Sequence, residues 1–229
     1  MKKGEQVTLS GRTGAGKSTI LKLLLGLYEP QSGSIRIGNV SATEVPEEER
    51  RSLFGYVEQS FHMVPGTVRE QITLYDRSIT EKQVQAAARL TGLEIRSPVW
   101  KMATIPCVPR RSFREGQWQL LSIARAAVAE PKLLLLDEHT AALDPGTAEK
   151  VLSLTRRIVE EHQLTCLMIT HNMQSAIDLG NRILMMDSGK IVLDIGGEEK
   201  KNMTVEGLLK KFRSGAGKAL DNDRILLSE

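Results

Sequence analysis

Short apolar segments alternate with longer amphipathic segments along most of the chain. Residues 133–136 are four consecutive leucines, a run typical of a strand buried on both faces of a parallel sheet. The pattern predicts strands at 7–9, 34–37, 55–59, 133–136, 165–170, 182–186 and 191–193, and helices at 18–27, 67–74, 80–90, 116–129, 147–161, 173–179 and 205–212. Strands that alternate with helices predict an α/β fold with a mainly parallel sheet.

The pattern changes along the chain in a way that predicts its organisation. Residues 60–130 are mainly helical, and the alternation of strand and helix resumes at residue 131. We therefore expect an α/β core formed by 1–59 and 131–203, an inserted helical subdomain at 60–130, and a C-terminal helix and tail at 204–229. Thr80 and Gln83 have the spacing of a capping box, which predicts where the helix 80–90 begins.

The composition is that of an ordinary globular chain, with 229 residues, 41% of them apolar and 26% charged. The net charge of +3 is too small to indicate a nucleic-acid partner, and none is expected. No apolar run is long enough to span a membrane, and the start lacks the apolar stretch of a signal peptide. Cys107 and Cys166 lack metal-ligand spacing and are consistent with a reduced, cytosolic chain.

Residues 11–18 carry the most specific motif, Gly-x-x-x-x-Gly-Lys-Ser, between a predicted strand and a predicted helix. That context distinguishes a loop that binds nucleotide phosphates from a plain glycine turn. The glycines let backbone N–H groups approach phosphate, and the helix directs its positive end at the same anion. Lys17 is expected to reach the β- and γ-phosphates, and the Ser18 hydroxyl to bind Mg²⁺. The predicted nucleotide contacts are Gly11, Arg12, Thr13, Gly14, Ala15, Gly16, Lys17, Ser18 and, next in the helix, Thr19.

Two acidic residues end the leucine strand, and two further polar residues end other strands. The carboxyl edge of a parallel sheet is where its ligands bind, so Asp137 is predicted to hold Mg²⁺. Glu138 is placed to polarise the attacking water. His171 is predicted to lie near the γ-phosphate, and Gln59 to reach Mg²⁺ or the water. The simpler alternatives are an acidic strand end facing solvent and a structural histidine.

In this order the motifs resemble those of ATP-binding-cassette (ABC) ATPases. The series consists of the loop 11–18, Gln59, a helical insert, residues 113–117 at a helix start, Asp137 with Glu138, residues 142–144, and His171. The resemblance covers nearly the whole chain and implies a P-loop (RecA-like) NTPase core that hydrolyses ATP with Mg²⁺. The chain lacks a guanine-specificity motif, which argues against a GTPase.

The resemblance also implies an assembly. Two such domains would pair head to tail, so that Arg114, Gly116 and Gln117 of one domain face the ATP of the other. Asp144 would be an acid at this interface. The helical insert and the region after Gln59 would dock on transmembrane permease subunits, which implies a cytoplasmic chain on the cytoplasmic face of a membrane. Within each site, Glu138 would be the catalytic base and His171 the γ-phosphate contact.

The sequence departs from the ABC pattern at two places. Arg114 and Glu115 occupy positions where the family usually has serine and glycine. Because the negative charge of glutamate is unfavourable near phosphate, we expect the site that this motif completes in the partner domain to be weakened. The sequence leaves a homodimer and a heterodimer open, and the altered motif favours a heterodimer that also holds a better site. Ten residues precede Gly11 and none is aromatic, so we expect a shortened N-terminus without an aromatic platform for adenine.

Three functions are consistent with these features. The leading one is the ATP-hydrolysing subunit of a membrane transporter. The second is a non-hydrolytic or weakly active nucleotide-binding regulatory module. It is favoured by Arg114 and Glu115, which alter the family's signature motif at residues 113–117. The third is a soluble ABC ATPase outside transport, which the lack of a coiled-coil insertion opposes. Residues 59–74 resemble exporters and 130–195 resemble importers, so the sequence leaves the substrate and the direction of transport open.

Overall fold

The computed structural model describes residues 1–60, 62–93, 115–141 and 143–215. The chain forms two compact units, and each is described by itself. Unit 1 consists of Met1–Arg50 and Thr165–Glu229, and unit 2 consists of Arg51–Leu164. The predicted division at residues 59, 130 and 203 stays a prediction.

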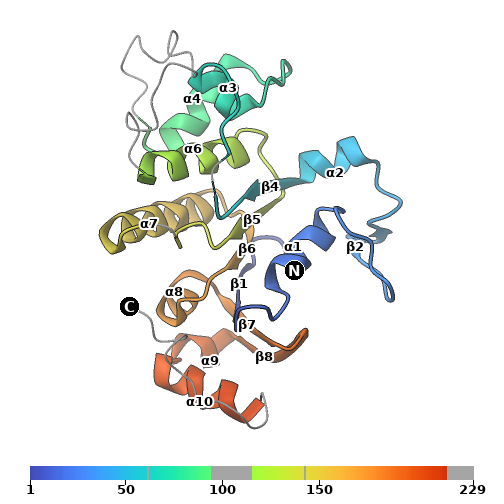
Figure 1. Ribbon diagram of the computed structural model, residues 1–229, viewed down its shortest axis with the longest axis vertical. Helices are drawn as coiled ribbons and strands as arrows, with labels where there is room; N and C mark the ends of the chain where they lie inside the picture. The colour runs from blue at the N-terminus through green and yellow to red at the C-terminus, as the bar shows by residue number, and fades with distance from the viewer. Residues whose placement is uncertain (61, 94–114, 142, 216–229) are drawn as a thin grey trace. The chain divides into compact units, whose positions relative to one another are not determined.

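Unit 1 is built around strand β1 (Gln6–Gly11), which pairs in parallel with β6 (Thr165–Ile169) and β7 (Arg182–Asp187) (Figure 1). Leu9 lies opposite Ile169 on one side and Leu184 on the other. Strand β8 (Lys190–Gly196) turns back antiparallel to β7. The other elements are α1 (Lys17–Leu24), α8 (Met173–Leu179), α9 (Gly197–Lys201), α10 (Val205–Gly215), and the short strands β2 (Arg36–Ile37) and β3 (Val40–Ser41).

The apolar face of α10 closes one side of unit 1. Leu208 and Phe212 are fully buried, in a cluster with Met173 of α8 and with Ile183 and Met185 of β7. Burying a side chain of this size contributes roughly 1.5–3 kcal/mol. The predicted helix 205–212 is thus confirmed, and it belongs to the core of unit 1.

Unit 2 combines a parallel strand pair with a helical core. Strand β4 (Phe54–Val57) pairs with β5 (Leu133–Asp137), so that Val57 lies opposite Leu136. Val68, Ile72, Val84 and Leu121 belong to one buried cluster that joins three of its helices. The helices of the unit are α3 (Val68–Thr73), α4 (Glu81–Leu90), α6 (Glu115–Ala127) and α7 (Pro145–Glu161). The parallel pairs in both units confirm the predicted α/β fold with a mainly parallel sheet.

Local capping explains where several helices begin. Thr80 caps α4 in a capping box with Gln83, as predicted, and Thr67 forms a second box with Glu70 at α3. The sequence pattern missed three elements, namely β3, α9 and α2 (Glu47–Leu53). Helix α2 was missed because six of its seven residues are charged or polar and offer no apolar periodicity.

Among the described residues, no helix is long and apolar enough to cross a membrane.

Candidate nucleotide site

The loop between β1 and α1 has the backbone of a phosphate cradle. Gly11, Gly14 and Gly16 all have positive φ values, of 138°, 79° and 95°. A Cβ on Gly11 would overlap the carbonyl oxygen of Met186 on the neighbouring strand β7, so only glycine fits there. The fold therefore requires glycine at residue 11, and the positive φ values favour glycine at residues 14 and 16.

Lys17 is the charged group of this loop, and it is only 6% exposed. Its Nζ donates hydrogen bonds of 3.0 Å to the carbonyl oxygens of Gly11 and Arg12, so the ammonium lies across the loop. Lys17 is also the first residue of α1, whose N-cap Gly16 supplies no side-chain cap and whose first turn contains no acid. A buried cation and the positive end of a helix together make this loop attractive to phosphate.

His171 lies at the same edge of unit 1 as the phosphate loop. Strands β1 and β6 are parallel with Leu9 opposite Ile169, and the Thr170 N–H donates to the Leu9 carbonyl oxygen at 3.2 Å. His171 follows directly, and Asn172 then caps α8 by accepting from the Ser175 N–H at 2.8 Å. The structure thus brings His171 and the loop 11–18 to the carboxyl ends of neighbouring strands.

A second group of predicted residues gathers in unit 2. Asp137 ends β5 and is 8% exposed, and Glu138 follows it. Because Val57 pairs with Leu136, Gln59 follows the end of β4 at the same edge as these two acids. The amide oxygen of Gln59 and the carboxylate of Asp137 are oxygen donors of the kind that Mg²⁺ accepts alongside phosphates and water. Within the described residues, no group of three or more histidine, cysteine or acidic side chains could hold a metal by itself.

Tyr56 is a contact of Asp137 that the sequence pattern did not reveal. Its hydroxyl donates to Asp137 Oδ2 at 3.5 Å. Burial, with the nearby carboxylates of Asp137 and Glu58, raises the pKa of Tyr56 to about 12. The phenol therefore remains a neutral donor beside the acid. Alternation along β4 could have placed Tyr56 on one face, but not against a residue 81 positions away.

The polypeptide turns sharply after Asp137. Glu138 has a φ of 42°, a left-handed conformation that is uncommon for residues other than glycine. His139 is 2% exposed, and burial lowers its pKa to about 4, so its ring is neutral. Its Nε2 lies 3.4 Å from Thr155 Oγ1 on α7. Sequence reasoning missed both His139 and Thr155.

Of the predicted signature motif at residues 113–117, the structure describes only residues 115–117. Arg114 lies outside the described residues, whereas Gly116 and Gln117 lie in the first turn of α6. A Cβ on Gly116 would come within 2.5 Å of Thr147 Cγ2, so α6 and α7 approach closely here. Asp144 is exposed and caps α7 by accepting from the Thr147 N–H at 3.0 Å, which holds the pKa of Asp144 below its ordinary value.

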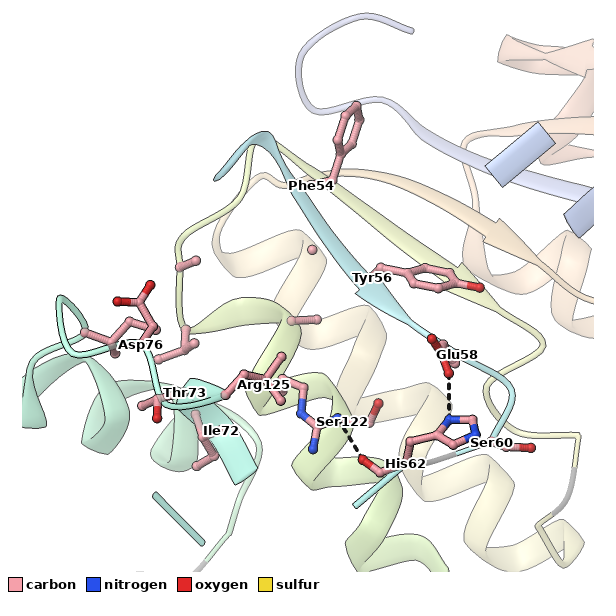
Figure 2. Close-up of a pocket in the computed structure, with 16 residues that line it drawn as sticks. Phe54, Tyr56, Glu58, Ser60, His62, Ile72, Thr73, Asp76, Ser122 and Arg125 are labelled. Carbon is pink, nitrogen blue, oxygen red and sulfur yellow. Dashed lines mark hydrogen bonds and ion pairs between the residues drawn. The ribbon is translucent and has the colours of Figure 1, made fainter. Parts of the chain in front are cut away.

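A groove of about 460 Å³ lies beside β4 in unit 2 (Figure 2). Arg125 of α6 lies along it and donates to the backbone carbonyl oxygens of Gln71 at 2.7 Å and His62 at 3.1 Å. Glu58 pairs with His62 at 2.8 Å near the mouth. Thr73 Oγ1, which is buried in the groove lining, has no hydrogen-bond partner among the described residues. The groove therefore offers polar groups beside an apolar lining.

Known proteins share these features. A family model described as ABC transporter matches residues 1–141. The chain is 36% identical to the tyrosine transport ATP-binding protein of Clostridioides difficile over 91% of its own length and 86% of that protein. It is also 36% identical to a methionine import ATP-binding protein of Paraburkholderia xenovorans, over 83% of its own length and half of that protein.

A solved structure agrees with these sequence matches. The structure of a bacterial Atm1-family ABC exporter with ATP bound superposes with a TM-score of 0.74 and 27% identity, over 94% of this chain and 38% of that one. The fold is accordingly that of a P-loop NTPase. These matches, together with the phosphate loop of unit 1, show that the chain belongs to the ABC transporter family as an ATP-binding, ATP-hydrolysing component.

Proposed function

We propose that this chain drives solute transport by binding MgATP on the loop 11–18 and hydrolysing it with Glu138 as the base. The single observation that carries the proposal is the position of Lys17, a buried cation that opens α1 and is held over the loop by two backbone carbonyls. Such an ammonium can move from carbonyl oxygens to phosphate oxygens at little cost, since both are acceptors.

The remaining roles are proposed from the resemblance to the family and from the strand ends that carry these residues. Gly11, Arg12, Thr13, Gly14, Ala15, Gly16 and Thr19 would line the phosphates, and Ser18, Gln59 and Asp137 would supply oxygen ligands to Mg²⁺. His171, at the carboxyl end of β6, would contact the γ-phosphate. Mg²⁺ would neutralise charge that develops on the phosphates, while Glu138 orients and deprotonates the water.

The site is proposed to be completed by a second ABC ATPase domain. Arg114, Gly116 and Gln117 would face the nucleotide bound to that partner, and Asp144 would lie at the interface. Asp144 already accepts a hydrogen bond from the Thr147 N–H as the α7 cap, so an interfacial role would join a structural one. Because Arg114 and Glu115 replace the usual residues, we propose a heterodimer in which this signature serves the weaker site.

Transmembrane permease subunits are the proposed partners of the groove in Figure 2, which would place the chain on the cytoplasmic face of a membrane. Arg125 and Glu58 would meet polar groups of the permease, and Thr73 Oγ1 would gain a partner there. Relatives named for tyrosine transport and methionine import favour an amino acid as the solute and import as the direction.

Steady-state hydrolysis tests the proposal. The Glu138→Gln variant should retain ATP binding and lose turnover by about a hundredfold or more, because it keeps the shape of the base without its proton affinity. Lys17→Ala should lose ATP binding itself, measured by calorimetry. Turnover that is unchanged in Glu138→Gln would sink the hydrolytic role.

The second candidate, a weakly active nucleotide-binding module with a regulatory role, is favoured by Arg114 and Glu115 in the signature motif at residues 113–117. It predicts tight ATP binding and slow turnover in the wild-type chain, alone or with its partner domain. Restoring the family residue with Arg114→Ser would then raise turnover. An unchanged rate in Arg114→Ser would count against a weakened signature.

A further inference from the structure

The turn between β5 and α7 carries the proposed base, and its backbone conformation requires support. Glu138 has a φ of 42°, in the left-handed region. This conformation is unfavourable for a residue other than glycine, so surrounding contacts must stabilise it. Its carbonyl oxygen accepts from the Ala141 N–H at 2.9 Å, which closes a tight turn. The direction of the Glu138 carboxylate therefore depends on what holds this turn.

His139 anchors the turn in the interior of unit 2. The residue directly after Glu138 is 2% exposed, and its Nε2 lies 3.4 Å from the hydroxyl of Thr155, which is fully buried on α7. Thr155 lies 16 residues after His139, within α7, so this contact ties the turn to a separate element of unit 2.

The hydrogen-bond pattern fixes the form of the ring. Thr155 Oγ1 donates its single hydrogen to the Val151 carbonyl oxygen at 2.8 Å. Since a hydroxyl has one hydrogen, Thr155 accepts from His139, which must carry its proton on Nε2. The imidazole thus acts as a donor from the turn to the helix, and a side chain without an N–H at this position would leave the buried Thr155 lone pair unused.

We propose that His139 and Thr155 form a positioning pair that holds Glu138 in its left-handed conformation and so directs the catalytic carboxylate. The proposal rests on the role of Glu138 proposed above. Neither residue of the pair touches substrate. Their effect passes through the backbone of the turn, whose distortion by a fraction of an ångström is enough to slow a reaction that depends on an aligned water.

The first test compares kinetic parameters of variants. His139→Ala and Thr155→Val should each lower kcat by roughly tenfold to a hundredfold. The KM for ATP should stay within about twofold of wild type, because neither substitution changes the phosphate loop at residues 11–18. His139→Gln, which keeps an N–H at similar reach, should recover much of the rate. The double variant should be no slower than either single one, as expected for one shared contact.

Ser153→Ala is the matched control. Its hydroxyl donates to the Glu149 carbonyl oxygen at 3.0 Å, the same intrahelical bond that Thr155 makes, but Ser153 is exposed whereas Thr155 is fully buried. The control should keep the wild-type kcat. An equal loss of rate in Ser153→Ala would show that the effect comes from α7 in general, and it would overturn the pairing.

Hydrogen exchange separates this proposal from the assignment of the base. The Ala141 amide should exchange at least tenfold faster in His139→Ala and Thr155→Val than in wild type and Ser153→Ala, whatever the ATPase rate.

The combined outcomes distinguish the two assignments. If Glu138→Gln abolishes turnover while both pair variants keep wild-type kcat, the positioning role of His139 and Thr155 is wrong and the assignment of Glu138 as the base is right. If Glu138→Gln remains active while Ala141 exchange rises, the pair holds the turn but the assigned base fails. Unchanged Ala141 exchange in both pair variants, with the fold intact by circular dichroism, would refute the anchor.

Discussion

The phosphate loop in unit 1 and the acidic turn in unit 2 reach their conformations by different means. The loop depends on its own sequence, since three glycines supply positive φ values and Lys17 binds carbonyl oxygens five and six residues before it. The turn depends on distant residues, because Asp137 contacts Tyr56 and His139 contacts Thr155. The conformation of the phosphate loop is thus encoded mainly by nearby residues, whereas the acidic turn, which is proposed to carry the base, is positioned by packing.

The largest expected effect on stability tests whether nearby residues alone determine the conformation of the phosphate loop. Gly11→Ala should lower the free energy of unfolding by about 3 kcal/mol, because its Cβ would overlap the Met186 carbonyl oxygen of β7. Gly14→Ala is the control, with a φ of 79° but nothing within 4 Å of its Cβ, and should cost about 1 kcal/mol. Urea unfolding without nucleotide measures both. Equal losses would mean that φ alone, not the approach of β7, dictates glycine at residue 11.

This difference explains what could be predicted from the sequence. The motif at 11–18 and the capping box of Thr80 with Gln83 depend on neighbours within a few residues, and both agree with the structure in conformation. The order of motifs also led to the right family. The contact of Gly11 with Met186 joins positions in different strands, and that of Arg125 with Gln71 spans 54 residues. Neither has a local signal, because periodicity reports which face is buried and not which residue covers it.

An intermediate effect is expected in unit 2, where Gln71 is a fully buried link between two elements. Its side-chain amide oxygen accepts from the Val64 N–H at 3.1 Å, and its amide nitrogen donates to the Val64 carbonyl oxygen. The backbone carbonyl oxygen of Gln71 accepts a hydrogen bond from Arg125. Gln71→Leu should cost about 2 kcal/mol, since the Val64 groups lose their partners. Gln85→Leu on α4, where the partly exposed amide contacts only the side chain of Glu81 among the hydrogen bonds described, should change stability by less than about 0.5 kcal/mol.

Gln71→Leu also sharpens the comparison between the units. If phosphate binding is local to unit 1, this variant should bind ATP with an affinity within about twofold of wild type while its unfolding midpoint falls. Calorimetric titration with ATP at a temperature well below that midpoint gives the affinity. A large loss of ATP affinity in a folded Gln71→Leu chain would show that ATP binding depends on the packing of unit 2 as well as on the phosphate loop.

The smallest effect is expected at an exposed ion-pair cluster in unit 1. Arg182 donates to Asp194 at 2.6 Å across the β7–β8 pair and to Glu5 at 3.0 Å. The hydrogen bond from Arg182 holds the pKa of Asp194 below its ordinary value of 3.8. Since the side chains of Arg182 and Asp194 are substantially exposed and screened by solvent, Arg182→Gln should cost less than about 1 kcal/mol at pH 7.

The pH dependence of that cost identifies its origin. A carboxyl group with a lowered folded-state pKa contributes stability above its unfolded pKa, and loses it as the pH falls through the folded value. The difference in unfolding free energy between wild type and Arg182→Gln should therefore be constant from pH 7 to about 5 and shrink below about pH 4. Urea unfolding at a series of pH values measures it. A difference that persists at pH 2 would assign the loss to the aliphatic stem of Arg182 packing on the sheet rather than to charge, which would make even this surface cluster a product of packing.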